Sequence, residues 1–161
     1  MNPAQIHLAL THLPVFGYLL FTPLFFFALW KKKQDLLTLV SIMFVLLSLS
    51  AIIVFNTGEG AEELVEEIAG VSHDTIHEHE ESGEISFWLL SISGLAAALV
   101  LALRVSLFHS KQFKLLILMA LFLVATTVSS LYTAHLGGKI RHPETSIVPV
   151  PESHSDEGDN D

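Results

Sequence analysis

Four long apolar runs alternate with short polar segments along this chain of 161 residues. Each run approaches the roughly 20 residues that an α-helix needs to cross the hydrocarbon core of a bilayer. The runs cover residues 6–30, 36–55, 85–108 and 113–135. The pattern predicts an all-α membrane protein whose four spans form a transmembrane helix bundle.

The polar segment between the second and third runs has a pattern of its own. Residues 56–60 read Asn-Thr-Gly-Glu-Gly, and these turn formers predict a break at the end of the second span. In residues 61–71, apolar side chains alternate at helical spacing with pairs of glutamates. This stretch predicts a short amphipathic helix on the outer surface of the membrane, because it is too short to span.

The end of the chain differs from the rest in composition. Gly137 and Gly138 predict the end of the fourth span. Residues 145–161 are acidic and contain two prolines, which is typical of a disordered tail. The folded part is therefore predicted to be one four-span bundle over residues 1–144.

Composition agrees with a membrane-embedded domain and limits its chemistry. Hydrophobic residues make up 51% of the chain, more than a soluble domain of this size can bury. There is no cysteine, which excludes disulfides, iron–sulfur clusters, thiolate zinc sites and covalently attached haem. The net charge of -9 argues against nucleic-acid binding. The spans hold no nucleophile with a base and no carboxylate dyad, so we expect a component without substrate chemistry of its own.

Charge predicts how the bundle lies in the membrane. Residues 56–84 hold ten acids and no Lys or Arg, whereas the other two connections are basic. The lysines of those connections are Lys31, Lys32, Lys33, Lys111 and Lys114. The positive-inside rule then places the basic connections in the cytoplasm and both termini outside the inner membrane of a bacterium.

Eight of the nine histidines fall on the predicted outer side. They are His7, His12, His73, His77, His79, His135, His142 and His154. Counting residues through the membrane puts His12 and His135 at matching depth just inside the outer boundary. Neutral imidazole is a usual axial ligand of haem iron, and helix bundles hold cofactors between facing side chains. The sequence thus predicts haem b between His12 and His135.

Other histidines offer alternatives. His7 precedes His12 by five residues, about 140° round a helix, so it lines a different and shallower position. His77 and His79 lie among glutamates, where a solvated surface is the plain interpretation and loose binding of a divalent cation the functional one. A histidine at a helix end often lies in the headgroup region and only bonds backbone or water there, and that interpretation applies to each of these histidines.

Residues 7–14, His-Leu-Ala-Leu-Thr-His-Leu-Pro, resemble the HPxxxHxP opening of a bacterial four-helix membrane protein family classed as a domain of unknown function. The likeness continues through residues 57–63, the His-Glu pair before the third span and the His-Leu-Gly-Gly of residues 135–138, and departs at Leu8, where the family has proline. It implies a haem-bearing or redox-associated membrane module, because the domain can be joined to cytochrome c-like segments. The candidate positions it carries over are His7, His12, His79 and His135, with Gly137 and Gly138 as structural ones.

Three hypotheses follow from these observations. The first is a membrane cytochrome b-like protein that passes electrons near the outer face to a quinone, a periplasmic electron carrier or a respiratory complex. The second is a non-haem divalent metal protein, with ligands drawn from nearby glutamates and from His7, His12, His77, His79 and His135. The third is a structural or assembly subunit whose acidic outer face docks a basic partner.

Overall fold

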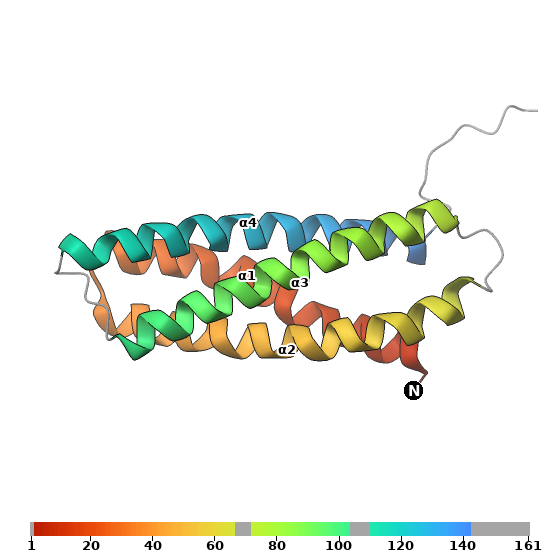
Figure 1. Cartoon of the computed structure of the whole chain (residues 1–161), viewed down its shortest axis with the longest axis horizontal. Helices are drawn as coiled ribbons and strands as arrows, with labels where there is room; N and C mark the ends of the chain where they lie inside the picture. The colour runs from red at the N-terminus through yellow and green to blue at the C-terminus, as the bar shows by residue number, and fades with distance from the viewer. Residues whose placement is uncertain (1, 67–71, 104–109, 143–161) are drawn as a thin grey trace, which may run out of the picture.

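The computed structural model describes residues 2–66, 72–103 and 110–142, with only the backbone at residues 110–112. It consists of four helices, α1 (Pro3–Trp30), α2 (Gln34–Glu66), α3 (His73–Ala102) and α4 (Ser110–Arg141) (Figure 1). All four are long and apolar enough to cross a membrane, which confirms the predicted all-α four-helix bundle of a multi-pass membrane protein. The predicted tail at 145–161 and the end of the third span at 104–108 lie outside the described residues.

The helices surround a common axis in an antiparallel order. Helices α1 and α3 each pack against both α2 and α4. In the described residues the backbones of α1 and α3, and those of α2 and α4, do not come close together, so these two pairs are diagonal. The start of α1, the end of α2, the start of α3 and the end of α4 gather at the right-hand side of Figure 1. We call this the acidic end, after the carboxylates of Glu59, Glu62, Glu63, Glu66, Asp74, Glu78, Glu80, Glu81 and Glu84.

The bundle core changes in character along its axis. Toward the opposite end, which carries Lys31–Lys33 and is called the basic end, large apolar side chains interlock: Tyr18 and Phe25 both pack on Phe44, with ring centroids 5.0 and 6.4 Å apart. Toward the acidic end the buried side chains are mostly small. They are Pro14, Ala51, Ala61, Ser82, Ser86 and Ser130, with Ile76 and Leu136 as the larger exceptions.

Helix α2 approaches its neighbours closely at two points. A Cβ atom placed on Gly94 of α3 would overlap the side chain of Ser48, so only glycine allows this crossing. Ser48 donates a hydrogen bond of 2.6 Å to the carbonyl oxygen of Leu90, which ties α2 to α3. A Cβ on Gly17 of α1 would likewise overlap Leu47.

The predicted break at residues 56–60 and the separate amphipathic helix at 61–71 are wrong. Helix α2 continues without interruption to Glu66, so residues 61–66 form its last turns, and 67–71 lie outside the described residues. The turn formers stay helical because α1 lies against them: a Cβ on Gly58 would be 3.6 Å from the His7 ring, and one on Gly60 would be 3.4 Å from Pro3.

Helices α3 and α4 are also longer at the acidic end than the sequence predicts. Helix α3 begins at His73, so the polar approach to the third span is itself helical. Helix α4 runs through Gly137 and Gly138 to Arg141, and the predicted stop at the two glycines is wrong. The reason is again a neighbouring helix, since Gly137 faces the ring of His79.

Candidate functional site

His7 projects from α1 toward α2 near the acidic end. Its Nδ1 lies 3.1 Å from the carbonyl oxygen of Val54 and 3.1 Å from the hydroxyl of Thr57, and the side chain is half-buried. Thr57 donates its own proton to the same carbonyl at 2.8 Å. Because a carbonyl only accepts, Nδ1 of His7 is the protonated nitrogen, and in the neutral ring Nε2 keeps a free lone pair.

His79 is held in the same way in the other half of the bundle. It projects from α3 toward α4, where Nδ1 lies 3.0 Å from the carbonyl oxygen of Thr133. The same reasoning puts the proton on Nδ1 and leaves Nε2 as the acceptor. Its ring packs against Gly137, where a Cβ would come within 3.1 Å of the ring carbon Cε1.

The two histidines form a matched pair. In each case the first helix of a hairpin supplies a histidine, the second supplies a carbonyl, and a glycine four residues beyond that carbonyl faces the ring: Val54 with Gly58, and Thr133 with Gly137. Helices α1 and α3 are diagonal, so the two imidazoles come from opposite helices of the bundle. A carbonyl bond to Nδ1 is the usual way in which proteins orient a histidine that binds a metal through Nε2.

The structure does not turn His12 or His135 into the bundle. Both side chains are exposed; Nδ1 of His12 lies 2.6 Å from the carbonyl oxygen of Leu8 in its own helix, and its ring stacks on Phe16 at 5.7 Å. The expectation that His12 and His135 face each other inside the bundle therefore differs from the structure. Helix geometry explains the difference, because with His7 inside, a residue about 140° away points outward. Their binding of a cofactor stays a prediction that rests on depth alone.

His77 lies on the exposed side of α3. It is 3.7 Å from Glu80 and 3.4 Å from Glu81, contacts that become ion pairs when the imidazole is protonated. His73 makes a similar contact of 3.8 Å with Glu66. Within the part of the chain that the structure describes, no three or more His, Asp or Glu side chains are arranged to hold a metal ion.

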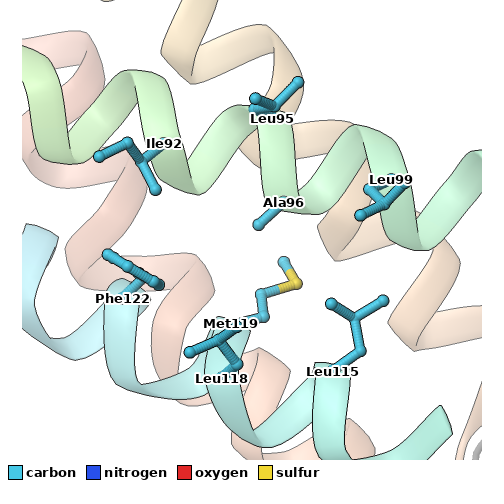
Figure 2. Close-up of a pocket in the computed structure, with 8 residues that line it drawn as sticks. All are labelled: Ile92, Leu95, Ala96, Leu99, Leu115, Leu118, Met119 and Phe122. Atoms are coloured by element: carbon cyan, nitrogen blue, oxygen red, sulfur yellow. The ribbon is translucent and has the colours of Figure 1, made fainter.

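A shallow apolar groove of about 200 Å³ lies between α3 and α4 on the basic side of the bundle (Figure 2). It is lined by Ile92, Leu95, Ala96, Leu99, Leu115, Leu118, Met119 and Phe122. Figure 2 shows that these side chains offer no charged or hydrogen-bonding group, so the groove suits a hydrocarbon chain rather than chemistry.

Sequence reasoning missed the partners of the two histidines, Thr57 and the carbonyls of Val54 and Thr133. A signal for the inward face was nevertheless present. In α3, His79 is followed by Ser82, Ser86 and Ser93 at spacings of three, four and seven residues, which is one helix face. In α1, His7, Thr11, Tyr18 and Thr22 share a face in the same way. In lipid, polar residues mark the side of a helix that faces its neighbours.

Comparison with known proteins gives this chain no relatives: no protein-family model, no curated protein and no solved structure matches it.

Proposed function

We propose that the acidic end of the bundle binds b-type haem through His7 and His79, and that the protein transfers electrons in a membrane. The observation that carries this proposal is the matched pair itself. Two histidines on diagonal helices have the same carbonyl bond at Nδ1, which leaves Nε2 of each free to bind a ligand.

The residues around the pair fit a haem group. Two neutral imidazoles are a common ligand set for haem iron, and a chain without cysteine has neither a thiolate ligand nor a covalent attachment point for haem. The glycine beside each ring leaves room for the imidazole, and Ala51, Ser82 and Ser86 keep the buried side chains near the pair small, with Ile76 and Leu136 as the larger ones. A haem held by these residues would supply one-electron redox chemistry. The hydrogen bonds to the carbonyls of Val54 and Thr133 fix the orientation of the two rings.

The charge distribution suggests where electrons leave. The positive-inside rule favours the basic end in the cytoplasm and the acidic end, with both termini, on the outer side of the inner membrane of a bacterium. Carboxylates such as Glu78 and Glu81 are exposed around the site, and their field attracts a basic carrier in the periplasm. A quinone in the membrane or a larger respiratory complex would be the alternative electron partner.

An absorption spectrum of protein purified from haem-replete cells, oxidised and then reduced, tests the proposal. We expect a Soret band that is lost in His7→Ala and in His79→Ala. His12→Ala and His135→Ala are the matched controls, because they remove exposed imidazoles from the same helix ends, and both should keep the band.

Two results would overturn this assignment. Loss of the band only in the His12→Ala and His135→Ala variants would favour the pair that matches in membrane depth. A wild-type protein with no Soret band at all would reject haem. Bound metal without porphyrin would then indicate the non-haem metal protein. A protein with neither porphyrin nor metal would indicate a structural or assembly subunit.

A further inference from the structure

A cluster of hydroxyl groups begins beside His79, at the interface of α3 and α4. Ser82 is 2.6 Å from the hydroxyl of Thr133, Thr133 is 2.9 Å from Ser86, and Ser86 is 2.7 Å from Ser129. The four hydroxyls form an unbroken hydrogen-bonded chain. The hydroxyl of Thr133 also donates to the carbonyl oxygen of Ser82 at 3.0 Å, so it accepts from its hydroxyl neighbours. A hydroxyl can both donate and accept, and once Thr133 rotates away from that carbonyl, the chain can pass a proton from one member to the next.

A second cluster of hydroxyl groups lies deeper in the bundle. The hydroxyl of Tyr18, on a fully buried side chain, is 2.9 Å from Ser48 and also interacts with Ser93. Ser93 is in turn 2.6 Å from Thr126 of α4. Beyond this cluster, toward the basic end, large apolar side chains such as Phe25 and Phe44 dominate the core. The buried hydroxyls there bond elsewhere: Thr22 to Thr127 at 3.0 Å, and Ser41 to the carbonyl oxygen of Leu37 at 2.8 Å.

Ser130 occupies the gap between the two clusters. It lies on α4 four residues after Thr126 and three before Thr133, which places the three residues on one helix face. Ser130 is 3% exposed, and its hydroxyl has no hydrogen-bond partner among the described residues. Hydroxyls on helices commonly bond the carbonyl four residues back, as Thr127 does to Leu123 at 2.7 Å. Ser130 does not, and a buried polar group of this kind is typically satisfied by water.

We propose that Ser130 binds a buried water molecule that joins the two hydroxyl clusters into a proton path from the acidic end to Tyr18. Each step breaks one O–H bond and forms another: a hydroxyl or water accepts a proton on one side and gives up its own on the other. One proton moves, and nothing is oxidised or reduced. Among the described residues, the buried hydroxyls below Tyr18 bond outside this chain of groups, and large apolar side chains surround them. The path therefore ends at Tyr18, and protons reach it from the acidic end. The path starts beside His79 but does not rest on haem binding.

Exchange of the Tyr18 hydroxyl proton with D₂O tests the path directly. The chain has two tyrosines, so Tyr132→Phe leaves Tyr18 as the sole tyrosine. In this background, with ring-labelled tyrosine, the infrared C–O stretch of Tyr18 reports when its proton is replaced by deuterium. Ser130→Val and Ser130→Thr are matched in size, and only the second keeps a hydroxyl for water.

We expect Ser130→Val to slow the exchange by about tenfold or more, because exchange then requires local opening of the bundle, and Ser130→Thr to retain most of the rate. Ser130→Ala, which adds no volume, should also slow the exchange of the Tyr18 proton. It replaces Ser130→Val in the test if the larger side chain prevents folding. Ser91→Ala, which removes a hydroxyl bonded to its own helix outside the path, should leave the rate unchanged. Equal rates in the valine, alanine and parent proteins would overturn the proposal.

Discussion

At the scale of single residues, the two site histidines have equivalent bonds but unequal surroundings. His7 has two acceptors for one proton, the carbonyl of Val54 and the hydroxyl of Thr57. His79 has one acceptor, the carbonyl of Thr133, and packs more closely on its glycine. A Cβ added to Gly137 would lie 3.1 Å from the His79 ring, whereas one added to Gly58 would lie 3.6 Å from the His7 ring. The orientation of the His7 ring therefore depends more on hydrogen bonding, and the orientation of the His79 ring depends more on steric packing against its glycine.

Gly137→Ala should displace the ring of His79. A Cβ at 3.1 Å is closer than ordinary contact, so either the ring or the helix must shift. We expect haem affinity to fall by about tenfold, a typical effect of disturbing the support of a ligand. Titration of the apoprotein with haem, followed at the Soret band, measures it. Gly138→Ala, which meets nothing within 4 Å, is the control, and equal affinities in the two variants would contradict the role of Gly137.

Thr57→Val should weaken the orientation of His7 while keeping the shape of the side chain. The carbonyl of Val54 remains as an acceptor, so we expect a loss in haem affinity at the lower end of the range for supporting residues, about tenfold. The same titration measures the change. Thr57→Ser keeps the hydroxyl and should bind as tightly as the wild type; a serine variant as weak as the valine variant would show that packing, rather than the hydrogen bond, matters.

At the scale of helices, α2 packs closely on its neighbours at two glycines, Gly17 of α1 and Gly94 of α3. Gly94→Ala should force α2 and α3 apart, because the new methyl group meets the Cβ as well as the hydroxyl of Ser48, and the Cβ is fixed by the backbone. We expect a loss of about 1–3 kcal/mol in unfolding free energy, as for other overpacked interiors. Unfolding in mixed micelles, followed by circular dichroism, measures it.

Gly17→Ala gives a comparison within the same bundle. Its new methyl group meets the outer carbons of Leu47, which can change rotamer, so its cost should be smaller than that of Gly94→Ala. The reverse order would contradict this explanation of the two crossings.

The sequence predicts four helices but not how far they extend. Apolar runs identify the lipid-facing lengths, whereas residues 56–60 and Gly137 look like helix breaks when each segment is considered alone. Inside the bundle Gly58 and Gly137 each face a histidine ring of the neighbouring helix, and the helices continue through them. Whether a glycine ends a helix or admits a neighbour depends on contacts distant in the sequence.

The site is predictable in its residues but not in its pairing. The sequence names His7 and His79 as candidates, yet membrane depth favours His12 and His135. Depth gives the level of a residue in the membrane but does not specify which face of its helix points inward. Helix α1 is apolar around nearly its whole circumference, so its apolar pattern marks no face. The bonds that orient the rings come from Val54 and Thr133, 47 and 54 residues away.

At the scale of the whole molecule, charge divides the bundle into two ends. The chain has no cysteine, so a single introduced thiol reports its own side of the membrane. We expect Ser72→Cys, exposed at the acidic end, to react with a membrane-impermeant maleimide in intact spheroplasts. Asp35→Cys, exposed at the basic end, should react only after lysis. The opposite pattern would reverse the proposed orientation.

The matched pair divides the site evenly between two hairpins. Helices α1 and α2 supply His7 with its carbonyl, and α3 and α4 supply His79 with its own. A chain cut between Glu66 and Ser72 would thus yield two fragments with one ligand each, and neither alone could hold iron from both sides. With haem bound as proposed, the Soret band would appear only when the two fragments associate, and it would then report helix association in a membrane.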